Sequence, residues 1–97
     1  IEIAAGRQLT YAAARAMDAD EGGAAATLEA AMAKLYASDV AQRVTQEGQL
    51  LHGGWGFAEE FPICRYVLDS LVLPIFEGVK PILELKVIAR GLLAGER

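Results

Sequence analysis

The stretch that decides the fold is His52-Gly-Gly-Trp-Gly-Phe-Ala-Glu-Glu-Phe-Pro62. Three of its first five residues are glycine, and such a run ends a helix and lets the backbone approach a neighbouring group closely. Pro62, at its far end, is typical of the first turn of a new helix. The stretch therefore predicts a tight turn between two helices.

Helical periodicity extends outward from this turn in both directions. Apolar residues recur at helical spacing in four segments, at about 1–18, 25–51, 62–71 and 81–93. Between the first two, residues 18–23 break the pattern with acidic residues and two glycines, and residues 75–78 form a short non-helical link before the last. No segment reads convincingly as a strand. The sequence predicts an all-α, up-down antiparallel bundle of about four helices.

The longest predicted helix has a recognisable apolar stripe. Its members are Leu28, Met32, Leu35, Tyr36, Val40 and Val44. The charged residues fall mostly off this stripe: Glu29, Lys34, Asp39, Arg43 and Glu47. In the first segment, Ile1, Ala5, Leu9, Ala12 and Ala16 repeat in the same way. These stripes predict the faces that form the core.

Composition indicates that the chain does not bury all of its apolar surface alone. It has 97 residues, 54% of them hydrophobic, and a mean hydropathy of +0.27. A chain this short has too little interior for so many apolar side chains. We therefore expect residues 1–97 to be a single helical domain of a longer protein, which packs against other domains or subunits and self-associates through its apolar faces.

Charge and cysteine content exclude several functions. A formal net charge of −4 argues against a nucleic-acid partner, which needs clustered basic residues. No apolar run approaches the roughly 20 residues of a membrane span, and no secretory signal opens the chain. Cys64 is the one cysteine, which excludes an internal disulfide framework and a thiolate metal cluster and is compatible with the reducing cytoplasm.

The spacing between the glycine turn and the last helix is the most specific feature. Gly-Gly-Trp-Gly-Phe57 is followed by Glu60, Arg65, Asp69 and, eight positions later, Glu77-Gly78. This pattern resembles the C-terminal signature of acyl-CoA dehydrogenases. Ala33–Ala41 and Val87–Arg90 also resemble the helices that flank that signature. The resemblance covers essentially the whole chain.

The resemblance implies a fold, a reaction and partners. Members of this family carry an N-terminal helical domain and a middle β-domain before the helical domain, and these two are expected to be missing from residues 1–97. The implied cofactor is FAD, the implied substrate is an acyl-CoA thioester, and the implied assembly is a homodimer or homotetramer formed through helical faces. A carboxylate removes the proton α to the thioester while the β-carbon gives a hydride to the flavin.

The same resemblance assigns the site residues. Glu77 corresponds to the catalytic base and Gly78 to a position beside the substrate thioester. Gly53 and Gly54 correspond to a turn that meets the FAD of a neighbouring subunit. Leu50 and Val79 correspond to further cofactor-contacting positions.

Glu77 has two interpretations. It follows the apolar run 73–76, and an apolar setting disfavours the charged form of a carboxylate, which makes it a stronger general base. An ion pair with the nearby Lys80 would oppose that effect. Alternatively, Glu77 stabilises the N-terminus of the last helix through the helix dipole. With the resemblance added, catalysis is the preferred interpretation.

The remaining polar and aromatic residues have mainly structural interpretations. The three glycines form a turn, with or without a cofactor beside it. His52 is expected to hydrogen-bond at a helix end, Trp55 and Phe57 to pack, and Cys64 to be a small buried residue. Three charged residues are expected to pair and hold the third helix against the bundle: Glu60, Arg65 and Asp69.

The chain departs from the family pattern at three positions. Leu50, Val79 and Leu83 are apolar where the family has polar residues that contact FAD. Each lost hydrogen bond weakens cofactor binding by about 0.5–1.5 kcal/mol. The first hypothesis is an FAD-dependent acyl-CoA dehydrogenase. The alternative is a non-catalytic, flavin-poor subunit or oligomerisation domain of a heteromeric complex, and a plain helical interaction module is the third.

Overall fold

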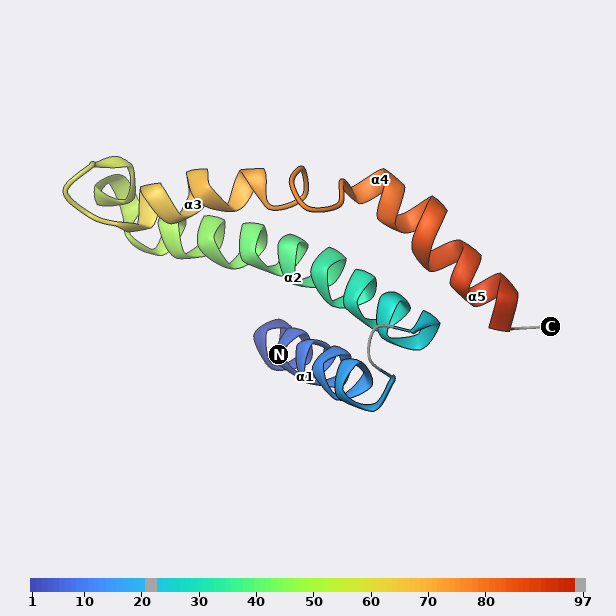
Figure 1. The fold of residues 1–97 in the computed structure, drawn as a ribbon. Coiled ribbons are helices and arrows are strands. Elements are labelled where there is room, and N and C mark those ends of the chain that lie inside the picture. Colours follow the sequence, from blue (N-terminus) through green and yellow to red (C-terminus); the bar gives the residue numbers. More distant parts are fainter. Residues whose placement is uncertain (21–22, 96–97) are drawn as a thin grey trace.

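The computed structural model describes residues 1–20 and 23–95, and these residues are almost entirely helical. The elements are α1 (Glu2–Asp20), α2 (Ala24–Leu51), a 3-10 turn (Gly53–Phe57), α3 (Ile63–Val72), α4 (Lys80–Ile82), a π-helical turn (Leu83–Ile88) and α5 (Ala89–Gly95). Helix α2 runs antiparallel to α1 and to α3 (Figure 1). The predicted all-α, up-down antiparallel bundle is confirmed, with no strand in the described part of the chain.

Helix α2 is the centre of the arrangement. Helix α1 packs along one side of it, and α3 and the π-helical turn pack along the other (Figure 1). The result is an elongated molecule of 53 × 24 × 20 Å. The bundle is therefore open, because α1 and α3 both pack mainly on α2.

The core is small and consists of small side chains. The buried apolar residues are Ala26, Ala31, Ala33 and Val40. Among the described residues, no large side chain is fully buried. On the predicted stripe only Val40 is buried, four members are half-buried, and Val44 is exposed. The stripe prediction was too narrow because α2 has neighbours on two sides, and alanines allow the closest helix approach.

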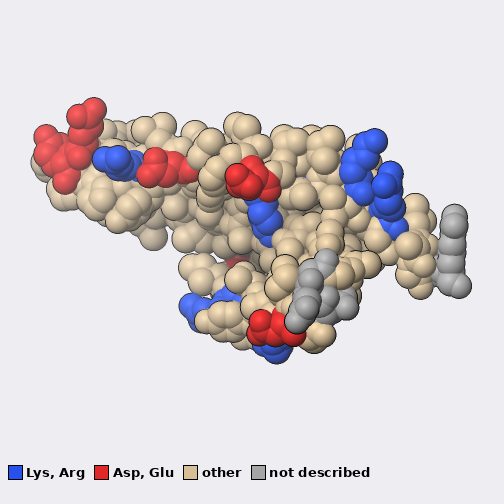
Figure 2. All heavy atoms as spheres, viewed as in Figure 1, with Lys and Arg blue, Asp and Glu red and all other residues tan. Residues whose placement is uncertain are grey.

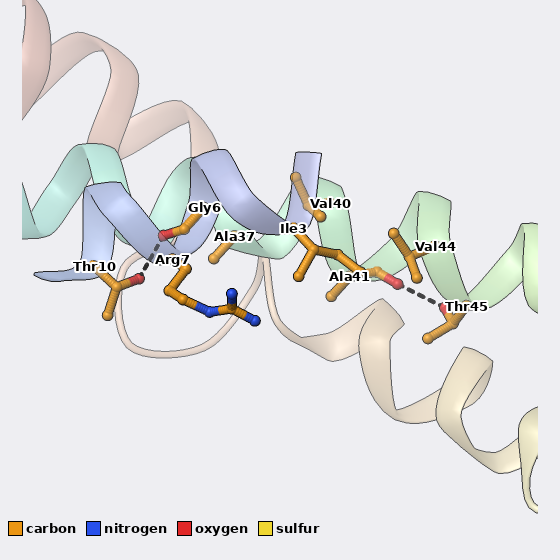
Figure 3. Close-up of a pocket in the computed structure, with 9 residues that line it drawn as sticks. All are labelled: Ile3, Gly6, Arg7, Thr10, Ala37, Val40, Ala41, Val44 and Thr45. Carbon is orange, nitrogen blue, oxygen red and sulfur yellow. Dashed lines mark hydrogen bonds between the residues drawn. The ribbon is translucent and has the colours of Figure 1, made fainter. Parts of the chain in front are cut away.

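Helix α1 approaches α2 at a glycine. Gly6 is buried, and a Cβ atom placed on it would lie 3.7 Å from the Tyr36 ring. Beside this contact lies a shallow hollow of about 340 Å³, lined by small and apolar side chains of both helices (Figure 3). Ile1 and Ala5, predicted to face the core, are exposed because the start of α1 presents Glu2 and Gly6 to α2 instead.

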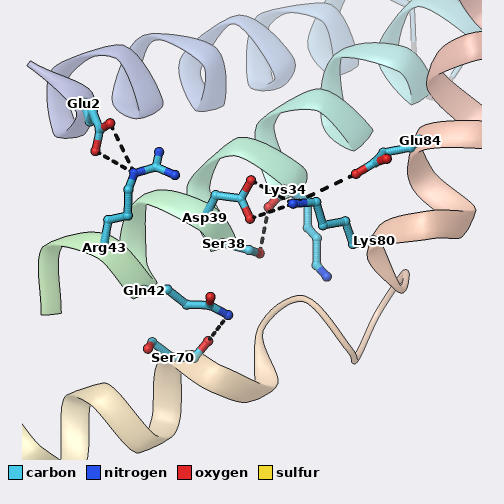
Figure 4. A network of polar contacts seen from close by, with 9 residues as sticks. All are labelled: Glu2, Lys34, Ser38, Asp39, Gln42, Arg43, Ser70, Lys80 and Glu84. Carbon is cyan, nitrogen blue, oxygen red and sulfur yellow. Dashed lines mark hydrogen bonds and ion pairs between the residues drawn. The ribbon is translucent and has the colours of Figure 1, made fainter. Parts of the chain in front are cut away.

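A row of polar residues on α2 faces α3 and the link that follows it. We call this row the polar seam: Lys34, Ser38, Gln42, Thr45 and Gln49. Gln42 Nε2 donates to the carbonyl of Ser70 over 3.5 Å (Figure 4). Thr45 and Ser70 share a hydrogen bond of 3.3 Å between their hydroxyl oxygens. The seam spaces its members by three or four residues, so they lie on one face of the helix.

The last helix begins as predicted and contains one irregularity. It runs from Lys80 to Gly95, with Pro81 in its first turn. Within it, the N–H of Ala89 donates to the carbonyl of Glu84, which widens residues 83–88 into a π-helical turn. The predicted break at 18–23 is in part wrong, because α1 continues to Asp20; Glu21 and Gly22 lie outside the described residues.

Candidate functional site

Glu77 lies in the non-helical link between α3 and α4. Its backbone has φ +52°, in the left-handed region, and the next residue, Gly78, has φ +113°. A non-glycine residue in the left-handed region costs about 1–2 kcal/mol. Strain of this kind persists only where the surrounding structure imposes it, and it is concentrated at functional sites.

Lys34 holds this link in place. From α2, its ammonium group donates to the carbonyls of Leu73 and of Gly78, the second over 2.8 Å. The same Nζ lies 5.8 Å from the centroid of the Phe76 ring. The backbone N–H of Lys80 closes the link by donating to Pro74 over 3.0 Å. From the sequence, Lys34 was one of the charged residues off the apolar stripe and had no predicted role in the site.

The carboxylate of Glu77 is in no ion pair among the described residues. Lys80, expected beside it, pairs instead with Asp39 over 3.2 Å and reaches Glu84 at 4.0 Å (Figure 4). The residue at the N-cap of the last helix is Val79, and no side chain caps that helix. The described contacts therefore include neither an ion pair between Glu77 and Lys80 nor a side-chain hydrogen bond that caps the last helix.

Glu77 lines an open hollow beside the last helix. This hollow of about 440 Å³ lies among α1, α2 and the π-helical turn, and its other walls are mostly apolar, with Ala30, Ala31, Leu83 and Val87 among them. Glu77 itself is exposed. The sequence predicted an apolar setting around Glu77. The described residues supply apolar surface on one side of this residue only, and its other side is exposed.

The glycine turn has three glycines with different surroundings. Gly53 has φ +64°, and Gly53 and Gly54 have open space where a Cβ would be. Gly56 is buried, and a Cβ on it would lie 2.4 Å from the carbonyl oxygen of Gln49. Leu50, one turn earlier, is 73% exposed. Among its glycines, the turn therefore leaves open space beside Gly53 and Gly54 and packs closely at Gly56.

The structure separates the predicted site residues into two groups. Glu77, Gly78 and Val79 adjoin one another near Lys34, whereas Leu50, in the last turn of α2, and Gly53 and Gly54, just after it, lie at the other end of that helix. From residue 34 to residue 51, a helix rises roughly 25 Å at about 1.5 Å per residue. Within one chain, the two groups of predicted site residues therefore lie apart and do not meet.

Other predicted roles are corrected by the structure. His52 Nδ1 donates a hydrogen bond to the carbonyl of Gly48 over 2.7 Å, which confirms its helix-end role. Trp55 and Phe57 were expected to pack; Trp55 does contact the Phe61 ring edge to face, with centroids 5.7 Å apart, but both side chains remain 69% exposed. Cys64 is half-buried.

The third helix is not held by its charged residues. Arg65 and Asp69 approach to 4.0 Å, but both side chains are more than two-thirds exposed, at 82% and 71%. Exposed pairs of this kind stabilise little. Gln42 and Thr45 of the polar seam instead join α2 to α3 by hydrogen bonds to Ser70, whose side chain is buried.

Sequence reasoning missed two side chains that hold the candidate site in place, Lys34 at the link and Gln49 at the glycine turn. Gln49 Nε2 donates to the carbonyl of Gly56 over 3.0 Å, so it faces inward and does not replace the polar group missing at Leu50. The signal for both was the recurrence of polar residues every three or four positions from 34 to 49, on one face of α2.

Comparisons with known proteins agree with the geometry. The family model described as acyl-CoA dehydrogenase, C-terminal domain, matches residues 1–93. The chain belongs to the acyl-CoA dehydrogenase family. It is 40% identical over 93 residues to a short-chain specific acyl-CoA dehydrogenase of Megasphaera elsdenii, and 44% identical over 93 residues to a (2S)-methylsuccinyl-CoA dehydrogenase of Cereibacter sphaeroides.

A solved structure of this family has the same fold. Butyryl-CoA dehydrogenase from Megasphaera elsdenii superimposes with a TM-score of 0.83 at 40% identity, over 95% of this chain and 23% of that one. In the two sequence relatives the alignment covers 96% of this chain but only 23% and 16% of theirs. The chain therefore corresponds to less than a quarter of a typical acyl-CoA dehydrogenase.

The described residues carry no helix long and apolar enough to cross a membrane. Within the same residues, no group of three or more metal-ligating side chains is placed to hold an ion.

Proposed function

We propose that this chain is the C-terminal helical part of an FAD-dependent acyl-CoA dehydrogenase in which Glu77 removes the α-proton of the substrate. The observation that carries the proposal is the position of Glu77, an unpaired carboxylate on a strained corner of backbone beside an apolar hollow. Bound FAD supplies the acceptor for the hydride that leaves the β-carbon. Loss of the α-proton together with loss of this hydride leaves a double bond between the α- and β-carbons.

The contribution of this chain to the proton step is a base in a fixed place. A carboxylate without a salt-bridge partner keeps its lone pairs free to accept a proton. Gly78, next to it, has no side chain and so leaves room for the thioester against the backbone. Contact with other domains would cover the exposed side of Glu77, and a dry setting strengthens the base.

The glycine turn fits a flavin cofactor through its backbone and apolar surface. Gly53 and Gly54 leave open space on their outer side. Leu50 and Val79 present exposed apolar side chains, at 73% and 39%. These residues can contact a ring system but offer it no side-chain hydrogen bond. By this arrangement Leu50, Gly53, Gly54 and Val79 are the cofactor-contacting residues, with the turn facing the FAD of a neighbouring subunit.

The remaining surface is proposed to join domains and subunits. Large exposed apolar residues occur in every described helix from α1 to α5. On the face in Figure 2, charged side chains occur in a few separate places and uncharged surface extends between them. We assign this surface to contacts with the other domains of a longer, cytoplasmic protein and with other copies in a dimer or tetramer.

The proposal is tested on the full-length protein by its visible spectrum. Purified protein is expected to be yellow with flavin, and anaerobic addition of acyl-CoA should bleach it as hydride arrives. Glu77→Gln should keep its flavin and lose at least about 99% of the bleaching rate, because the base is absent. A Glu77→Gln variant that bleaches as fast as the parent would refute the assignment.

One observation favours the alternative of a flavin-poor subunit or oligomerisation domain. Positions 50, 79 and 83 are apolar, and the amide of Gln49, next to position 50, is engaged in the inward hydrogen bond to the carbonyl of Gly56. The same spectrum separates the two. A colourless, well-folded oligomer that stays colourless when FAD is added would support the non-catalytic subunit, and a yellow protein that bleaches would exclude it.

A further inference from the structure

The link that carries Glu77 does not hold its shape by local hydrogen bonds alone. Glu77 and Gly78 both have positive φ, at +52° and +113°, so two consecutive residues depart from helical and extended backbone. Within the link, Ile75 and Phe76 both bond back to Val72, and the N–H of Lys80 bonds back to Pro74, but none of these bonds uses a backbone group of Glu77 or Gly78. The two residues with positive φ therefore need a contact from elsewhere.

Lys34 supplies that contact from the middle of α2. Its two acceptors, the carbonyls of Leu73 and Gly78, lie at opposite ends of the link. One ammonium group therefore joins the start of the link to its end, with Phe76 beside the charge at 5.8 Å. Leu83 packs beneath Gly78, where a Cβ would lie 3.0 Å from its Cδ2 atom. Glu77 projects from a loop that is clamped on both sides.

The charge of Lys34 is directed at carbonyls, and this leaves the carboxylate free. Among the described residues Lys34 takes part in no ion pair, and Lys80 is occupied by Asp39 and Glu84. Lysine suits this task because its compact ammonium has three donors on a flexible stem, two of which the carbonyls use. The arrangement fixes the backbone at Glu77 without neutralising its side chain.

We propose that Lys34 is a positioning residue for the base: its clamp on Leu73 and Gly78 holds Glu77 where it meets the α-carbon of the substrate. This inference rests on the proposed function of Glu77. It predicts that losing the clamp lowers the rate of the chemical step while substrate binding changes little, because misplacing a reacting group by about 1 Å costs about 100-fold in rate.

The test compares Lys34→Met with Lys80→Met in the full-length, flavin-loaded protein. Methionine keeps most of the length of the lysine side chain but removes its hydrogen-bond donors. Lys80 is a matched control, because its side chain also joins two elements, through the ion pair with Asp39, but bonds to no carbonyl of the link. Lys34→Met should lower kcat by about 10–100-fold with KM changed far less. Lys80→Met should keep kcat near that of the parent.

A second readout follows the link without relying on turnover. Hydrogen exchange at the amides of Ile75, Phe76 and Lys80, which are bonded inside the link, should quicken by about tenfold or more in Lys34→Met. It should stay unchanged at the amides of α1. Lys34→Arg keeps a cation with donors in a different geometry, so its kcat should lie between Lys34→Met and the parent. Should Lys34→Met fail to fold, Lys34→Arg is judged by the same two readouts.

The outcomes separate this inference from the proposed function. If Glu77→Gln is inactive but Lys34→Met turns over like the parent, only the positioning role of Lys34 is overturned. Unchanged amide exchange in the link of Lys34→Met would overturn it as well. If Glu77→Gln remains active, the assignment of the base is wrong and the positioning role falls with it.

Discussion

Each glycine of the turn has a different reason to be glycine. Gly53 needs it for a backbone of φ +64°. Gly56 needs it because the carbonyl of Gln49 occupies the place of a Cβ. Gly54 has neither constraint, since its φ is not in the left-handed region and open space surrounds it. A glycine that the fold of this chain does not require is the one most consistent with close approach of a ligand or a neighbouring subunit.

This difference predicts unequal effects on stability. Gly56→Ala should lower the free energy of unfolding by about 2 kcal/mol or more, because the new methyl group meets backbone that must shift. Gly54→Ala should leave it within about 0.5 kcal/mol or raise it slightly, since alanine restricts the unfolded chain. Chemical unfolding followed by circular dichroism measures both. Equal losses in the two variants would contradict the assigned roles.

At the scale of the elements, helix bounds were largely predictable and helix faces were not. Proline and glycine mark the ends of α2, α3 and the last helix, and their backbone preferences act locally, so the sequence locates them within a few residues. Which residues of α2 are buried depends on its having neighbours on two sides. That property belongs to the assembled bundle, and the apolar stripe alone predicted one face instead of two.

The polar seam yields a prediction at this scale. Gln49→Leu removes the donor to the Gly56 carbonyl, and leaving a buried carbonyl without a partner should cost about 1–3 kcal/mol of unfolding free energy. Gln46→Leu, an exposed position on the same helix, is the control and should change it by less than about 0.5 kcal/mol. Thermal or urea unfolding of the two variants measures the difference, and similar losses would mean that the seam does not stabilise the turn.

The candidate site was predictable from the sequence only in its parts. The spacing from Gly53 to Gly78 indicated the family and with it Glu77, because that pattern is carried by consecutive residues. Lys34 was not found, because its hydrogen bonds reach residues 39 and 44 positions away. Contacts over such separations depend on how α2 and the link pack together, and no local pattern encodes them.

At the scale of the whole molecule, one chain presents two distant parts of a site. The proposed base, Glu77, and Lys34 lie beside the middle of α2, and the glycine turn lies roughly 25 Å away along that helix, at about 1.5 Å per residue. The exposed carboxylate and the exposed glycines both face away from the small core. This arrangement fits an enzyme whose sites form between domains and subunits, each chain serving one site with its base and another with its turn.

The most direct test of the central claim isolates the proton step in the full-length protein. The substrate is 3,3-dimethylbutyryl-CoA, whose β-carbon has no hydrogen, so that only the α-proton can be exchanged. In deuterated water the parent protein should exchange the α-hydrogens for deuterium, as followed by NMR, and Glu77→Gln should slow this exchange by about 100-fold or more. Exchange by Glu77→Gln at the rate of the parent would contradict the account.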